Sequence, residues 1–338
     1  MPAAQRLQGI LDWHGVDPSL RSNAHLVVGK PEKPIRGIDR IIHCASDTSF
    51  SERNRQRVWA ANVDLCRDLL DFAVRSRIPS FIQISTAYAA GRRSGPCVEE
   101  PIKNIRFTNV YEESKAAAEN LLLQRCVQEG ISLTILRPSI VYGDSRTGRT
   151  FRFNALYYPV KTALFLRRIF IEDILEGGGK RASGSGVFLE PDGTAVLPLR
   201  IEVNEKGGLN LIPVDFFTDA FFVLIGNSPN GGIYHIVNPL QTRIEDIIGY
   251  AQEQFKLKGI RACSPNDFKK QPRSPLELLF ARYMEAYSPY FKDSRIFLTD
   301  KTNGILRHYN ISCPPYDRNM FRRCMSYAVA HNWASPPL

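Results

Sequence analysis

Three features are absent from this 338-residue sequence, and each absence narrows the class of protein. The seven cysteines include no CxxC pair and no Cys/His cluster with zinc spacing, so neither a disulfide framework nor a structural zinc site is indicated. No run reaches 18 apolar residues, and residues 1–13 contain no apolar signal core. We therefore expect a cytoplasmic protein, or one peripheral to a membrane.

Basic residues outnumber acidic residues in this sequence. The 44 Lys and Arg against 34 Asp and Glu give a net charge of +10, most of which lies in residues 1–182. This excess favours a polyanionic partner. Nucleic acid is disfavoured, because the basic groups at 53–57 and 92–93 are short and have no interleaved aromatic residues. A phosphorylated cofactor or substrate, an acidic carrier protein and a membrane surface remain as candidates.

Residues 1–150 alternate short apolar strands with helical segments. Helical periodicity predicts helices over 55–75 and 114–129. The predicted strands are short and apolar, at 25–28, 39–45, 80–85 and 132–137. Alternation of this kind predicts a parallel sheet covered on both faces, that is, a doubly wound α/β domain.

The composition changes after residue 150, and we assign 151–338 to a smaller α/β substrate-binding region, interleaved with the last strands of the sheet. Its first segment, 151–176, is apolar and basic. Residues 177–186 are rich in Gly and Ser, which is typical of a flexible loop, and they do not fit the P-loop pattern. Further strands are predicted at 187–189, 195–203 and 232–237, and helices at 216–225 and 245–255.

The chemistry is indicated by Tyr111 and Lys115, which are four residues apart and fall on one face of a helix start. A nearby ammonium lowers the pKa of a phenol and lets it pass a proton near neutral pH. Ser85 and Thr86 end a strand, where parallel sheets build their sites, and supply a hydroxyl for the substrate oxygen. A second YxxxK match, 157–161, contains Pro159 and has no such strand before it, so we discard it.

Several motifs together extend this pattern: IIHCAS (41–46), ISTAYAAG (84–91), YEESK (111–115) and LRPSIVYGDSRTG (136–148). With Asn62, they resemble the extended short-chain dehydrogenase/reductase family. The chain looks most like its branch of thioester reductases and fatty acyl-CoA reductases, the "male sterility" NAD-binding type. The resemblance implies a Rossmann-like sheet and an oxidoreductase.

The resemblance also implies roles for individual residues. NADPH (or NADH) would deliver hydride to a carbonyl carbon, Tyr111 would protonate the oxygen, and Lys115 would hold the nicotinamide ribose. Thr86 would fix the substrate oxygen, with Ser85 as a second hydroxyl or a structural one. In the implied cofactor site, Ala45 and Ser46 would lie along the cofactor, and Pro138, Ser139 and Ile140 would flank the nicotinamide. Asn62 would hold helix and sheet backbone together at this site, with an exposed helical asparagine as the alternative.

The Gly-rich turn GxxGxxG, which binds the cofactor pyrophosphate in this family, is missing from the sequence. Only 37 residues precede Ile38, and the resemblance implies a first strand, helix and second strand upstream. We expect the first βαβ unit to be absent, either because the chain is truncated or because it is a diverged relative that does not bind dinucleotide.

Three functions stay open. The first is reduction of an acyl thioester, on acyl-CoA or an acyl carrier protein, to aldehyde or alcohol. The second is a nucleotide-sugar epimerase or dehydratase, or a hydroxysteroid-type dehydrogenase, on the same scaffold. The third is a non-catalytic relative. Segment 151–171 is interpreted as the lining of an acyl channel or a peripheral membrane contact, with a buried helix pair as the alternative.

Overall fold

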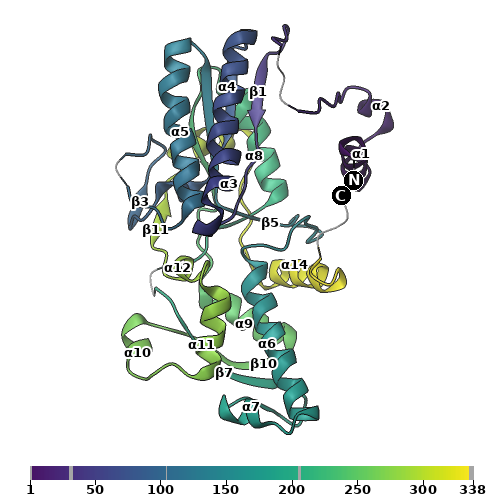
Figure 1. Ribbon diagram of the computed structural model, residues 1–338, viewed down its shortest axis with the longest axis vertical. Helices are drawn as coiled ribbons and strands as arrows, with labels where there is room; N and C mark the ends of the chain where they lie inside the picture. The colour runs from purple at the N-terminus through teal and green to yellow at the C-terminus, as the bar shows by residue number, and fades with distance from the viewer. Residues whose placement is uncertain (1, 30–32, 104, 205–206, 335–338) are drawn as a thin grey trace.

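A four-stranded parallel sheet forms the upper half of the molecule (Figure 1). The computed structural model describes residues 2–29, 33–103, 105–204 and 207–334. The strand order is β1-β2-β4-β9, and each neighbouring pair is parallel. The strands are β1 (Arg40–His43), β2 (Ser80–Ile84), β4 (Ser132–Pro138) and β9 (Gly232–Ile236). The predicted doubly wound α/β class is confirmed.

Helices cover both faces of this sheet because consecutive strand residues point to opposite sides. Phe81 of β2 packs against α4 (Leu65–Ser76) and α5 (Val110–Glu129). Its neighbour Ile82 packs on the other face against α8 (Val214–Gly226) and α13 (Asp300–Leu306). The sheet is therefore the middle layer of three.

The helix predicted over 55–75 forms in three parts: α3 (Arg55–Trp59), a π-helical turn (Ala60–Asp64) and α4. The helix predicted from 114 begins four residues earlier, at Val110, because the Asn109 side chain accepts a hydrogen bond from the backbone N–H of Glu112 (3.0 Å). This cap places Tyr111 in the first turn of α5.

The strand predicted at 25–28 does not form. Leu26, Val27 and Val28 are 45, 64 and 77% exposed, so the run buries little apolar surface. Within the described part of the chain, the outer edge of β1 has no paired strand, and residues 25–28 make no ladder with any strand. A β-branched run without pairing or burial gains nothing from the extended state. The helices α1 (Ala3–Trp13) and α2 (Pro18–Arg21) lie beside the body of the molecule (Figure 1).

The lower half is built around a second sheet of order β10-β7-β6. Its strands are β6 (Phe188–Leu189), β7 (Ala195–Glu202) and β10 (Leu257–Cys263). The helices of this half are α6 (Tyr157–Glu176), α7 (Lys180–Gly184), α9 (Ile244–Phe255), α10 (Pro265–Lys269), α11 (Pro275–Met284) and α14 (Arg318–Ala330). All of these elements except α10 contribute side chains to one large apolar core or pack against it.

Segment 151–176 is mostly the helix α6, and its apolar side is buried. Val160, Ala163, Leu166 and Phe170 all lie in the core of the lower half. This favours the buried-helix interpretation over the predicted membrane contact. In the described ranges, no helix has the length and apolar character needed to cross a bilayer.

The sequence predicts a loop over the Gly-rich segment 177–186. The prediction is only partly correct, because the segment contains the short helix α7. The Asp173 carboxylate accepts a hydrogen bond from the backbone N–H of Ala182 (2.8 Å), and the Asp173 carbonyl accepts one from Gly179 (2.8 Å). These two contacts fold the segment back on the end of α6.

Two short parallel pairs lie between the two sheets. They are β3 (Gly95–Cys97) with β11 (Arg295–Phe297), and β5 (Ile140–Tyr142) with β8 (Leu211–Pro213). The four-residue helix α12 (Ser288–Phe291) lies near the same level (Figure 1). The catalytic candidates gather at this level, where the strands of the upper sheet end.

Candidate active site

A cavity of about 350 Å³ opens at the carboxyl end of the upper sheet, and most of the predicted site residues line it. This is the size of an ordinary small-molecule site. Eight of the ten predicted residues lie in its wall: Ser46, Ser85, Thr86, Tyr111, Lys115, Pro138, Ser139 and Ile140. Residues from four separate segments therefore meet at one cavity.

Tyr111 and Thr86 are directly associated. Thr86 follows the end of β2, and its side chain forms a hydrogen bond with Tyr111. Burial of the Tyr111 phenol raises its pKa to about 12, and the hydrogen bond from Thr86 opposes this increase only in part. The sequence prediction of a lowered pKa is thus wrong, because desolvation is the largest effect on the phenol and the lowering contribution comes from Thr86 rather than from Lys115. The phenol is protonated at neutral pH and is available as a proton donor.

Lys115 lies under the pocket and is 2% exposed. Its ammonium donates a hydrogen bond to the carbonyl of Ile84, the last residue of β2, at 2.6 Å. Burial lowers the pKa of Lys115 to about 8, so the group is largely protonated at pH 7. Lys115 therefore fixes the end of β2 to the first turns of α5 and supplies the positive charge of the site.

We expect Lys115→Met to stabilise the fold at neutral pH. The fall in the pKa of Lys115 from 10.5 to about 8 corresponds to about 3 kcal/mol of buried-charge cost, from which the lost hydrogen bond to Ile84 subtracts about 1 kcal/mol. Between pH 8 and 10.5 the unfolded chain holds this proton and the folded chain does not, so wild-type stability rises with pH across that window. Urea unfolding at pH 7 should show a gain of about 2 kcal/mol that shrinks toward pH 10.

The matched control for this measurement is Lys161→Met, the same substitution at an exposed lysine of α6. It should change the free energy of unfolding by less than about 0.5 kcal/mol at either pH. A Lys115→Met protein that is less stable than wild type at pH 7 would contradict the expected cost.

Two predicted cofactor residues do not line the pocket. Ala45 is exposed, and Asn62 is buried in the π-helical turn. The Asn62 side-chain oxygen accepts hydrogen bonds from the Ser46 hydroxyl (2.9 Å) and the Asp47 N–H (2.8 Å). Its amide N–H groups donate to the Asp47 carbonyl (3.0 Å) and the Ser114 hydroxyl (2.9 Å). Asn62 thus joins the segment after β1 to α5 and positions the wall without touching the cavity.

Two buried hydroxyls in the pocket wall bear on whether a nicotinamide cofactor fits this site. The Ser85 and Ser139 oxygens are buried in the pocket wall and have no hydrogen-bond partner among the described residues. Unpaired buried hydroxyls are costly unless a ligand completes them. With Lys115 and Pro138 beside them, they fit the polar edge of a nicotinamide riboside. The sequence offers no Gly-rich turn for the pyrophosphate, so the fit is limited to this end of the cofactor.

Four aromatic side chains that line the pocket, the aromatic wall, were not predicted. Phe50, Tyr287, Tyr290 and Phe291 line it, and the Phe50 ring centroid lies 5.9 Å from Tyr111, 5.6 Å from Tyr287 and 5.5 Å from Tyr290. Three of these residues come from 287–291, more than 170 positions after Tyr111. The cluster of aromatics in that short segment was the available signal.

A buried polar network attaches this wall to α5, the helix that carries Tyr111 and Lys115. The Tyr290 hydroxyl donates to Glu112 of α5 (2.9 Å) and accepts from the Asn109 amide (2.7 Å). Arg295 contacts the same Glu112 carboxylate (3.4 Å) and forms an ion pair with Asp293 (2.8 Å). Glu112, the residue after Tyr111, therefore fixes the position of the aromatic wall relative to Tyr111.

Comparison with known families places this geometry in context. The family model NAD_binding_4, described as male sterility protein, matches residues 31–221, more than half of the chain. The chain belongs to the male sterility NAD-binding family. The resemblance inferred from the motifs is confirmed, and the match contains Tyr111, Lys115 and Thr86 as well as the cofactor candidates.

Curated relatives of this male sterility domain cover different parts of it. A 3β-hydroxysteroid dehydrogenase/Δ5→4-isomerase of Mycobacterium tuberculosis is 26% identical over 179 residues, which are 48% of this chain and 46% of that protein. A linear gramicidin synthase protein of Brevibacillus parabrevis is 24% identical over 287 residues, 79% of this chain and 5% of the synthase protein. The chain therefore spans about half the length of the first and a small part of the second.

Solved structures share the fold. The terminal R domain of the myxalamid PKS-NRPS pathway has a TM-score of 0.66 at 22% identity, over 89% of this chain and 70% of that domain. A thiolation-reductase di-domain from an archaeal non-ribosomal peptide synthetase has a TM-score of 0.57 at 18% identity, over 89% and 69%. UDP-glucuronic acid 4-epimerase of Bacillus cereus, in complex with NAD, also scores 0.57, at 18% identity over 87% and 75%.

Proposed function

We propose that this protein is an NAD(P)H-dependent reductase of acyl thioesters, carried on CoA or on an acyl carrier protein. The supporting observation is the character of the pocket wall around Tyr111. Of the described residues that line it, Lys115 is the one charged side chain, and most of the others are aromatic or aliphatic. An apolar wall of this kind suits an acyl chain, whereas a nucleotide sugar needs polar partners for its hydroxyls and charged partners for its diphosphate.

The chain's own residues supply the remaining requirements of a carbonyl reduction. A bound nicotinamide would supply hydride to the thioester carbonyl carbon. The Thr86 and Tyr111 hydroxyls, which already contact each other, would hold the carbonyl oxygen. Because its pKa is near 12, the Tyr111 phenol donates a proton as charge develops on that oxygen. The Lys115 ammonium stabilises the tyrosinate that remains.

The match to part of linear gramicidin synthase and the shared fold with R domains support a carrier-bound substrate. A second candidate, oxidation of a 3β-hydroxysteroid, is favoured by one observation: the 26% identical relative has that activity in its name, and the apolar cavity also suits a steroid ring system. The two candidates differ in the substrate's leaving group, since the thioester releases a thiol.

The deciding experiment measures NADPH oxidation by the chain with a saturated acyl-CoA and, in parallel, NAD reduction with a 3β-hydroxysteroid. Acyl-CoA-dependent oxidation with release of free thiol and formation of aldehyde or alcohol supports the proposal. Steroid turnover without acyl-CoA turnover replaces it with the second candidate. If neither saturating NADPH nor saturating NADH produces a fluorescence change with the protein, both enzymatic functions fail and the non-catalytic alternative remains.

A further inference from the structure

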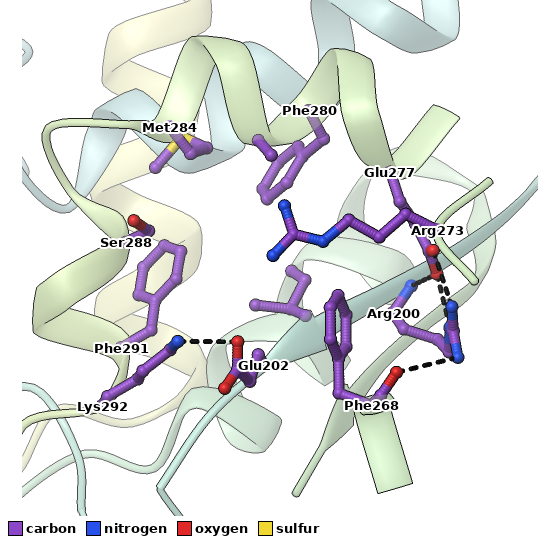
Figure 2. A pocket seen from close by; sticks show the side chains of 12 residues that line it. Arg200, Glu202, Phe268, Arg273, Glu277, Phe280, Met284, Ser288, Phe291 and Lys292 are labelled. Carbon is purple, nitrogen blue, oxygen red and sulfur yellow. Dashed lines mark hydrogen bonds and ion pairs between the residues drawn. The ribbon is translucent and has the colours of Figure 1, made fainter. Parts of the chain in front are cut away.

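A second cavity, of about 100 Å³, lies in the lower half between β7, α11 and α12 (Figure 2). Its apolar wall comprises Phe268, Phe280, Met284 and Phe291. Its polar lining is mostly charged: Arg200, Glu202, Arg273, Glu277 and Lys292, with Ser288 at one side. The volume corresponds to about three water molecules, which is room for one compact group and too little for a nucleotide.

The charges around this cavity do not cancel. Arg200 forms an ion pair with Glu277 (2.6 Å), and Lys292 forms one with Glu202 (2.6 Å). Arg273 forms no hydrogen bond or ion pair with any residue that the structure describes, and its guanidinium points into the cavity in Figure 2. One uncompensated positive charge therefore faces the space.

The loop that presents Arg273 is held firmly. The Arg200 guanidinium donates hydrogen bonds to the carbonyls of Pro272 (2.9 Å) and Gln271 (3.4 Å), immediately before Arg273. Immediately after it, Ser274 and Glu277 form a capping box at the start of α11. The Arg273 guanidinium also lies over the Phe268 ring, with its central carbon 5.3 Å from the ring centroid. The Arg200–Glu277 pair is thus the support that positions an otherwise free guanidinium.

The cavity adjoins the candidate active site across α12. Tyr287 and Tyr290 line the catalytic pocket, Ser288 and Lys292 line the second cavity, and Phe291 lines both. The two cavities are therefore neighbours on either side of α12, with the Phe291 side chain in both walls.

We propose that this cavity binds a phosphate group, held by Arg273 with Lys292 beside it. A guanidinium matches phosphate oxygens in a bidentate geometry, and Lys292 can add a contact from the same wall while it stays paired with Glu202. For the source of that phosphate the inference rests on the proposed function: acyl thioesters of CoA and of carrier proteins are attached through a phosphopantetheine arm. A free phosphorylated metabolite offers the same chemistry.

The binding test is a phosphorus NMR titration of the full chain with inorganic phosphate and, separately, with 4′-phosphopantetheine, at low salt and without cofactor. Wild type should bind both, and Arg273→Gln should weaken binding about tenfold or more. The matched control is Arg282→Gln, at an exposed arginine of α11 that does not line the cavity, and it should bind like wild type. Absence of binding in wild type, or equal weakening in both variants, would overturn the site.

The source is distinguished kinetically. If the phosphate belongs to the carrier arm, Arg273→Gln raises KM for an acyl-phosphopantetheine and leaves KM for the matching acyl-N-acetylcysteamine, which has no phosphate, unchanged. Phosphate binding with equal KM values in Arg273→Gln and wild type assigns the cavity to a free phosphorylated metabolite. Because the titration needs no turnover, its result stands whether or not the chain reduces thioesters.

Discussion

Replacing Tyr111 with Phe should reduce kcat for thioester reduction by about a thousandfold while leaving KM nearly unchanged. The substitution removes one oxygen atom, which is hydrogen-bonded to Thr86 and is the proton donor in the proposed reaction. Proton transfer by a positioned side chain contributes roughly 10²- to 10⁴-fold, and the ring that packs against Phe50 is retained. The measurement is NADPH oxidation with a saturated acyl-CoA, with near-UV circular dichroism to confirm that the fold is intact.

The control for Tyr111→Phe is Tyr287→Phe. Tyr287 lines the same pocket and is also packed against Phe50, at 5.6 Å. Its hydroxyl lies on the aromatic wall, and its removal should alter kcat by no more than about threefold. Equal losses in the two variants would show that pocket shape, rather than proton donation by Tyr111, limits the reaction.

The largest effect on stability should come from Arg137→Met. Arg137 of β4 and Glu119 of α5 form a buried ion pair, 2% and 0% exposed, with a shortest contact of 2.6 Å. Removal of the arginine leaves a buried carboxylate without its counter-ion between the helix and the sheet, at a cost of about 3–5 kcal/mol. Urea unfolding, followed by circular dichroism, measures this loss directly.

Two further variants separate the buried charge from the loss of packing. The double variant Arg137→Met/Glu119→Met removes both charges and should recover most of the lost stability. Arg125→Met breaks the ion pair with Asp71 on the same helix face of the sheet (2.6 Å), but these groups are 30% and 38% exposed, so its cost should stay below about 1 kcal/mol. A double variant as unstable as Arg137→Met would mean that volume, not charge, determines the effect.

The upper half of the molecule is predictable from the sequence because its signals are local. Apolar periodicity and the hydroxyl residues at a strand end predicted that Ser85, Thr86, Tyr111 and Lys115 lie at one edge of a sheet. The structure places all four there, around one cavity. The run at 25–28 shows the limit of such signals. The run contains β-branched residues, but a strand forms only when a neighbouring strand pairs with it. Whether such a strand is present cannot be read from residues 25–28 themselves.

The aromatic wall and the pKa of Tyr111 depend on tertiary packing and could not be predicted. Tyr290 and Glu112 are 178 positions apart in the sequence, so their hydrogen bond depends on how the intervening chain packs. Desolvation of the Tyr111 phenol is likewise the sum of many neighbours, so a cation four residues along the helix was a poor guide to its sign. Helix α7 formed in a Gly-rich segment for a similar reason, through contacts with Asp173.

Asn62 has a consequence for how this protein ages chemically. The side-chain oxygen of Asn62 accepts two hydrogen bonds, and its side-chain nitrogen donates two. Deamidation exchanges the nitrogen for oxygen at almost constant shape, yet the product has no N–H for the Asp47 carbonyl or the Ser114 hydroxyl. It would also place a second negative charge beside Asp47. A change of about one atomic mass unit would thereby weaken the connection between α5 and the segment after β1.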